Sequence, residues 1–125
     1  MLVRTWVLMA TVLGIASCTK PEMREASTAF DLDQVRPFLL RVSRDIERGF
    51  DSATVERVYA RIAALPLDST ITDDFTVSFD GRQYPLQLIA FMDDVNSPDL
   101  ALWTPSPLAE HIDSTMQAFL AQNEE

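Results

Sequence analysis

The chain contains very few of the residues that carry most catalytic and metal-binding chemistry. Of its 125 residues, Cys and His occur once each and Gly three times. Zinc sites need clustered Cys and His ligands, and phosphate-binding loops need several neighbouring Gly residues, so neither is expected here. A single Cys also excludes an intrachain disulfide. These shortages predict a protein without a bound metal or other cofactor.

The single histidine, His111, is a weak candidate for a catalytic base. It falls in a predicted helix, and neither of the nearby serines, Ser106 and Ser114, lies in a nucleophile-elbow sequence. Acidic residues around a predicted β-hairpin could instead pair as in a glycosidase; these are Asp73, Asp74, Asp93 and Asp94. Such a pair needs a cleft that raises one carboxyl pKa, which a core of about a hundred residues rarely builds. We therefore expect a protein that is not an enzyme, with a weak carboxylate-based hydrolase as an alternative.

One loop concentrates oxygen ligands of the kind that calcium prefers. Its members are Asp93, Asp94, Asn96, Ser97 and Asp99. Their spacing departs from that of an EF-hand, which has glycine at its sixth position and glutamate at its twelfth. Such clusters usually serve turns and helix caps. No metal site is predicted, although the sequence alone leaves cation binding in this loop open.

Basic residues are also scarce, with 10 Lys and Arg against 19 Asp and Glu and a formal net charge of -9. This balance argues against a nucleic-acid partner, because phosphate binding needs a basic face. Residues 19–61 hold eight basic and eight acidic residues, whereas residues 62–125 hold eleven acidic residues and only one basic residue, Arg82. The acidic second half can attract a basic partner over a long range. The alternative is an ordinary solvated surface.

No apolar run is long enough for a transmembrane helix, which needs about twenty residues. The run Trp6–Ile15 has ten residues and follows a single positive charge at Arg4. This order of regions is typical of an export signal peptide. We assign the signal peptide to residues 1–17.

The end of this segment resembles the lipobox of bacterial lipoproteins, which is an aliphatic residue, two small residues and a cysteine. Here the four positions are Ile15, Ala16, Ser17 and Cys18. The resemblance covers only the first 18 residues. It implies cleavage before Cys18, attachment of a diacylglyceryl group to the Cys18 thiol and, often, acylation of the new amino terminus. The competing interpretation is an ordinary secreted protein that is cut nearby and keeps a free thiol.

The lipid predicts where the protein is held, because two or three acyl chains anchor a protein stably to a membrane. In enterobacterial lipoproteins, an aspartate directly after the cysteine is the chief signal for retention in the inner membrane. This chain has Thr19 there, so the resemblance favours the periplasmic face of the outer membrane. Residues 19–30 show no sustained apolar period and include Pro21. We therefore expect a lipidated tether over residues 18–30 and one domain over residues 31–125.

Two helices are predicted at the start of this domain. Over about residues 33–48, apolar residues recur at spacings of three and four, namely Val35, Phe38, Leu39, Val42 and Ile46. A second helix should begin near Asp51 or Ser52 and stop before Pro66, with an inward stripe of Val55, Val58, Tyr59 and Ile62. The link through Gly49 is short, which predicts an antiparallel pair of helices.

Three arginines share one face of the first predicted helix. They are Arg41, Arg44 and Arg48. A solvated face, neutralised by Asp45 and Glu47, is favoured over an anion site.

Beyond residue 74 the apolar pattern changes from helical spacing to alternation. Phe75, Val77 and Phe79 alternate with polar residues, and either Asp80-Gly81 or Gly81-Arg82 offers a two-residue turn. The returning strand, from Gln83 to about Met92, carries Tyr84, Leu86 and Leu88 on the same face as the first strand. Its second face carries Ile89 and Phe91, which predicts that this face is partly covered too. Residues 100–104 are a candidate third strand.

The last helix should start at Ser106 and Pro107, a cap followed by a first-turn proline. Its inward stripe is Leu108, Ile112, Met116 and Phe119. The elements together predict an α+β fold. In it, two N-terminal helices precede an antiparallel β-hairpin with a candidate third strand, and a C-terminal helix packs on one side of the sheet.

Binding is the function that remains once catalysis and metal chemistry are disfavoured. The candidate partner-binding residues are Asp93, Asp94, Asp99 and Trp103; the alternative location for Trp103 is the core between the sheet and the last helix. We predict a lipid-anchored envelope protein that binds a basic protein, such as an inhibitor or immunity protein against a periplasm-acting toxin or hydrolase. The second hypothesis is an accessory lipoprotein of an outer-membrane or secretion assembly.

Overall fold

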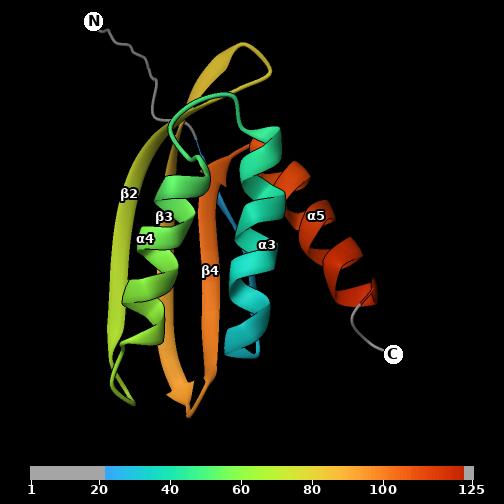
Figure 1. Cartoon of the computed structure of the whole chain (residues 1–125). Helices are drawn as coiled ribbons and strands as arrows, with labels where there is room; N and C mark the ends of the chain where they lie inside the picture. Colours follow the sequence, from blue (N-terminus) through green and yellow to red (C-terminus); the bar gives the residue numbers. More distant parts are fainter. Residues whose placement is uncertain (1–21, 123–125) are drawn as a thin grey trace, which may run out of the picture.

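The computed structural model describes residues 22–122, which form a four-stranded antiparallel sheet and three helices. In chain order the elements are β1 (Met23–Ala29), α3 (Leu32–Asp45), α4 (Ser52–Ala63), β2 (Thr70–Phe79), β3 (Arg82–Asp94), β4 (Ser97–Pro105) and α5 (Leu108–Gln122). The helices lie on one face of the sheet (Figure 1). The predicted α+β class is therefore confirmed, but the predicted order of elements is wrong, because a strand comes first.

Strand β1 lies where the sequence predicted part of a tether, so the folded domain begins near residue 23 and not at residue 31. It pairs antiparallel with β4, and Ala26 lies opposite Leu102. Ala26 is the only buried residue of this strand. An edge strand with so little apolar surface gives no alternation strong enough to recognise in the sequence.

The strands lie in the order β1-β4-β3-β2, so β4 is an interior strand. It extends beyond the predicted residues 100–104 at both ends. The predicted hairpin of β2 and β3 is confirmed, because Phe79 pairs with Arg82. Asp80 and Gly81 form its turn with φ values of 52° and 77°. Positive φ at both turn positions is the conformation that an Asp-Gly pair favours.

The core fills the space between the sheet and the helices. Phe38 of α3 stacks on Phe30 with ring centroids 5.0 Å apart, and Phe119 of α5 packs edge-on against it at 5.7 Å. The stripes predicted for the helices are buried, except that Tyr59 is only half-buried. The sheet contributes the residues that alternate toward the helices: Val77, Tyr84, Leu86, Leu88, Ala90, Met92, Leu100 and Leu102.

Helix α3 ends three residues before the predicted Arg48, because the next segment pairs with β2. The backbone N–H of Ser78 donates to the Arg48 carbonyl at 2.9 Å, and that of Glu47 donates to the Ser78 carbonyl at 2.7 Å. Gly49 then passes against Thr76 with φ at 94°. A β-carbon on Gly49 would lie 2.1 Å from the Thr76 carbonyl oxygen, so only glycine fits this position.

The strands give the domain two ends, which are at the top and bottom of Figure 1. We call the top the hairpin end; it holds the β2–β3 turn, the start of β1, the end of α3 and the start of α5. The bottom is the β3–β4 end, with the turn at Val95 and Asn96, the end of β1, the start of α3 and the end of α4. At about 3.3 Å per residue, the 13 residues of β3 separate the two ends by about 40 Å.

Candidate functional site

One face of the sheet has no helix over it within residues 22–122 (Figure 1), and we call it the open face. Side chains alternate along a strand, so every second residue contributes. The interior strands supply three directly opposed pairs: Gln87 with Trp103, Ile89 with Ala101, and Phe91 with Asp99. The outer strands add Glu25, Ser27 and Ala29 from β1 and Thr70, Thr72 and Asp74 from β2.

The middle of the open face is apolar. Ile89, Phe91, Ala101 and Trp103 lie beside one another on β3 and β4 and are half-buried. A shallow depression of about 370 Å³ is lined by three of them and by Ser27 and Ala29, among others. Among residues 22–122, these side chains are shielded only by their neighbours on the sheet. Contiguous apolar groups left in this state mark a surface that a partner can cover.

The charged side chains that the four strands place on the open face are all acidic. They are Glu25, Asp74 and Asp99, and no Lys or Arg alternates onto this face within the described strands. Asp74 is held by the side chain of Gln87, whose Nε2 donates to it at 3.0 Å. Arg24, the neighbour of Glu25, points to the helix side and forms an ion pair with Glu110 of α5 at 3.8 Å. The open face therefore combines an apolar centre with a polar margin whose charged strand residues are acidic.

The four residues predicted to bind a partner do not all lie together. Trp103 and Asp99 are both on the open face, and Trp103 is not in the core between the sheet and α5. Asp93 and Asp94 are exposed at the end of β3, beyond an irregularity in the pairing after Met92. Those two lie at the margin of the open face, at the β3–β4 end.

Sequence reasoning missed the apolar centre itself. It identified Ile89 and Phe91 as a second apolar face of the returning strand, but predicted that this face would be partly covered. In the structure, no element within residues 22–122 packs over these two side chains. The alternation of Ile89 and Phe91 was the available signal. It identifies an exposed apolar surface only when β4 is known to lie beside β3.

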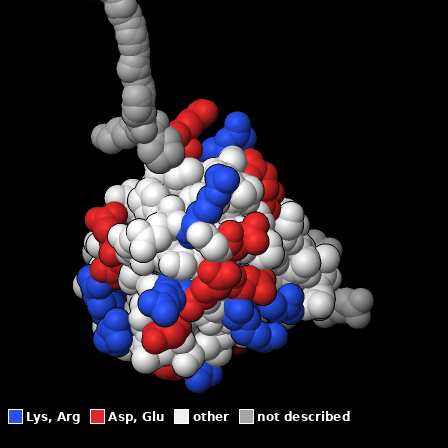
Figure 2. Space-filling view, turned by 90° about the horizontal axis from the view of Figure 1, so that it is seen from above, with Lys and Arg blue, Asp and Glu red and all other residues white. Residues whose placement is uncertain are grey.

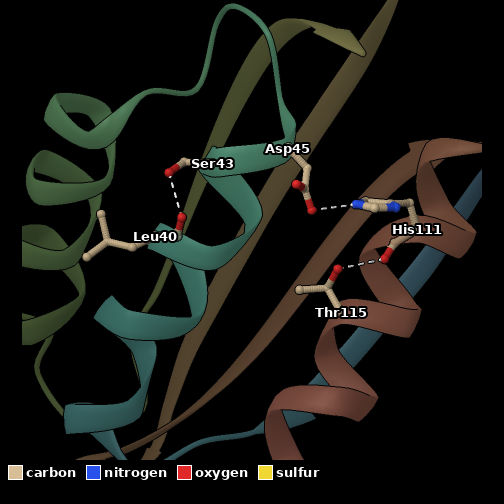
Figure 3. Close-up of polar contacts among 5 residues, drawn as sticks. All are labelled: Leu40, Ser43, Asp45, His111 and Thr115. Carbon is tan, nitrogen blue, oxygen red and sulfur yellow. Dashed lines mark hydrogen bonds and ion pairs between the residues drawn. The ribbon is translucent and has the colours of Figure 1, made fainter. Parts of the chain in front are cut away.

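His111 joins two helices and has no catalytic partner among the described residues. Its Nε2 lies 2.8 Å from Oδ2 of Asp45, at the end of α3 (Figure 3), and its ring packs against Phe79 at 5.0 Å. Ser106 does not serve it, because the Ser106 hydroxyl donates to Glu110 at 2.6 Å. That hydrogen bond lowers the pKa of the Glu110 carboxyl below its ordinary value, with a smaller contribution from Arg24.

The carboxylates proposed for a hydrolase do not converge. Asp73 faces the helices and pairs with Arg61, whereas Asp74, the next residue, lies on the open face. Asp93 and Asp94 lie beyond Phe91, which pairs with Thr70 at the far end of β2. No cleft brings any two of these four groups together in the described part of the chain, so the structure gives no support to a carboxylate mechanism.

The polar residues of the loop considered for calcium form a turn. Asp94 Oδ1 accepts the backbone N–H of Val95 at 2.8 Å, and Asn96 adopts a positive φ of 59°. Among residues 22–122, no group of three or more His, Cys, Asp or Glu side chains is arranged to hold a metal ion. Over the same residues, no helix is long and apolar enough to cross a membrane.

Comparison with known protein families, with curated proteins and with solved structures finds no match for this chain. The lipobox residues Ile15, Ala16 and Ser17 and the predicted lipid attachment at Cys18 lie outside the described residues.

Proposed function

We propose that this protein is a lipid-anchored, non-enzymatic binding protein of the bacterial cell envelope. Lipid on Cys18 would hold it, and the open face would capture a protein partner that presents basic side chains around apolar ones. The observation that carries this proposal is the composition of the open face, where Ile89, Phe91, Ala101 and Trp103 are bordered only by acidic charges.

The shape and chemistry of this surface suit a protein partner better than a small ligand. Small-molecule sites are concave and enclose most of their ligand, whereas the open face is a sheet surface with a shallow depression. Protein interfaces combine an apolar, often aromatic centre with a polar rim. Trp103 and Phe91 would be the anchors, because large aromatic side chains dominate binding energy at such centres. Glu25, Asp74 and Asp99 would speed and orient the encounter with a basic partner.

The partner class that best fits these properties is a basic toxin or wall-degrading hydrolase that acts in the periplasm. An inhibitor or immunity protein against such an enzyme needs to be small, confined near the membrane and complementary in charge. Thr19 after the lipidated cysteine favours the periplasmic face of the outer membrane as its location. Recruitment into an envelope assembly remains the second hypothesis, which the experiment below separates from the first.

This proposal is tested by comparing which proteins the wild type and an open-face variant capture from an envelope extract. The bait is the mature chain with Cys18→Ser, and the test variant carries Glu25→Lys and Asp99→Lys. The matched control carries Asp33→Lys and Asp113→Lys, the same change in charge at exposed acids of α3 and α5 on the helix side.

The expected result is a basic protein that salt releases from the wild type and the control but that the test variant does not retain. Purified partner should also shift the fluorescence of Trp103, the only tryptophan after residue 17. Equal loss in the control, or capture of an assembly component that the test variant still binds, would contradict capture through the open face.

A further inference from the structure

The chain enters the domain at the hairpin end. Met23 pairs with Pro105 at the start of β1, level with Pro85 and Thr76, a few residues short of the β2–β3 turn. Only residues 19–22 separate Cys18 from Met23. Five residue steps reach at most about 18 Å. An anchor on Cys18 would therefore keep the hairpin end close to the membrane surface.

The arginines without a polar partner gather at this same end. Five of the eight arginines in residues 22–122 contact a carboxylate, an amide or a hydroxyl: Arg24, Arg36, Arg41, Arg57 and Arg61. The other three are Arg44, Arg48 and Arg82, which are exposed and form no side-chain hydrogen bond or ion pair with any described residue. Arg44 is in the last turn of α3, Arg48 pairs through its backbone with Ser78, and Arg82 follows the hairpin turn.

The hairpin end also carries acidic groups, of which Asp80 and Glu22 are exposed and form no side-chain hydrogen bond or ion pair within residues 22–122. Three other acidic groups contact described residues. Asp45 contacts His111, and Glu110 contacts Ser106 and Arg24. Glu47 accepts the backbone N–H of Gly81 at 3.3 Å. Figure 2 looks down on this end and shows Arg side chains, in blue, among the acidic ones. Arg44, Arg48 and Arg82 are thus left to contact groups outside the domain.

The β3–β4 end has the opposite character. The segments that form it, residues 29–35, 61–72 and 91–99, contain six aspartates and one basic residue, Arg61, which is paired with Asp73. All six are exposed: Asp31, Asp33, Asp68, Asp93, Asp94 and Asp99. An anionic surface would therefore repel this end more strongly than the hairpin end, where arginines lie among the acidic groups. The aspartates lie about 30 to 40 Å from the hairpin end, several times the Debye length of about 8 Å, so their charge does not oppose contact there.

We propose that the hairpin end lies on anionic phospholipid head groups and that Arg44, Arg48 and Arg82 contact their phosphates. The domain then stands with its strands steeply inclined to the membrane, its β3–β4 end outward and the open face turned sideways to the periplasm. Guanidinium groups suit this role because they bind phosphate oxygens in a bidentate manner.

This inference depends on the lipid anchor of the proposed function, and a chemically supplied anchor separates the two. Cys18 is the only thiol of the chain, so the mature protein can be coupled through it to a maleimide lipid in nanodiscs. The discs contain phosphatidylcholine, with or without about one-third phosphatidylglycerol as the anionic lipid. A lipid with a nitroxide head group reports, by paramagnetic broadening in NMR spectra, which backbone amides lie near the surface.

With phosphatidylglycerol, broadening should be several-fold stronger at Gly49 and Gly81 than at Asn96, and in pure phosphatidylcholine this contrast should fall. Arg48→Glu with Arg82→Glu should abolish the contrast. The matched control, Arg36→Glu with Arg57→Glu, makes the same charge change on α3 and α4 away from the hairpin end and should keep it.

Equal broadening at Gly81 and Asn96 would overturn the proposed orientation. So would a contrast that disappears in both double variants, or one that persists in both. Well-dispersed spectra of each variant exclude unfolding as the cause. No partner protein is present, so a failure of capture through the open face cannot produce these outcomes. The lipid is attached chemically, so an absence of lipidation in the cell cannot produce them either.

Discussion

At the scale of single residues, Gly49 is the position where the fold most clearly requires glycine. It links α3 to α4 where the backbone passes the edge strand β2, with φ at 94°. The sequence marked it only as part of a short link between two helices, because the approach to the Thr76 carbonyl depends on how the helices dock on the sheet. Gly81 also has positive φ, at 77°, but nothing lies within 4 Å of the position its β-carbon would take.

Gly49→Ala is therefore expected to destabilise the domain by about 2 kcal/mol or more, since it adds a clash to the strain of a left-handed conformation. Gly81→Ala, the matched control, should cost about 1 kcal/mol through strain alone. Urea unfolding of the mature chain with Cys18→Ser measures both. Equal losses in the two variants would show that the passage at Thr76 is not tight.

Asp51 caps α4, and its carboxylate is expected to make the stability of the domain depend on pH. Its Oδ1 accepts the backbone N–H of Thr54 at 2.9 Å and the Thr54 hydroxyl at 3.0 Å. These hydrogen bonds lower the pKa of the Asp51 carboxyl below its ordinary value of 3.8. A lowered pKa in the folded state means that the carboxylate stabilises the fold fully above about pH 4 and that this contribution is lost as pH falls through the lowered pKa.

Asp51→Ala should lower the free energy of unfolding at neutral pH and flatten its decline below pH 4. Asp51→Asn retains a side-chain oxygen acceptor, so it should be the more stable variant at neutral pH while showing the same flattened acid decline. Thermal unfolding between pH 2 and pH 7 measures both quantities. An acid decline as steep as that of the wild type in both variants would exclude Asp51 as a source of the pH dependence.

At the scale of elements, the hairpin of β2 and β3 could be predicted because two local signals agree. Phe75, Val77 and Phe79 alternate, and Asp80-Gly81 provides the turn. The predicted stripes of the three helices also point into the core. The hairpin and the helices can be predicted because the spacing of apolar residues along a short segment is visible in the sequence.

Strand β1 could not be predicted, because it is defined by its partner. Only Ala26 is buried in it, and its pairing depends on β4, 70 or more residues later in the chain. The candidate site has the same dependence. Trp103 and Asp99 were identified from residue type alone, but their shared face with Ile89 and Phe91 exists only because β4 lies between β1 and β3.

The status of β1 as part of the fold can be tested within the strand. Ala26→Asp would bury a charge opposite Leu102 and should cost about 3 kcal/mol or more. Ser27→Asp, one residue later on the exposed side, should change stability by only about 0.5 kcal/mol. Denaturant unfolding of both variants distinguishes a strand from a tether, because a tether would tolerate the two substitutions equally.

At the scale of the whole molecule, two kinds of surface are separated in space. The hairpin end, where the chain arrives from Cys18, carries the three unpaired arginines, and the opposite end carries six aspartates. The open face runs between these ends along the strands, on the side away from the helices (Figure 1). A protein anchored at the hairpin end would thus leave its apolar and acidic binding surface accessible to a partner.

The most direct test of the open face is two-dimensional NMR of the mature chain with Cys18→Ser while the captured partner is added. Trp103 is the only tryptophan after residue 17, so its indole N–H gives a single resolved signal. The indole signal and the backbone signals of Ile89, Phe91 and Ala101 should shift or broaden first, while those on the outer surfaces of α3 and α4 stay unchanged. Changes confined to the helix side, with an unmoved indole signal, would contradict binding through the open face.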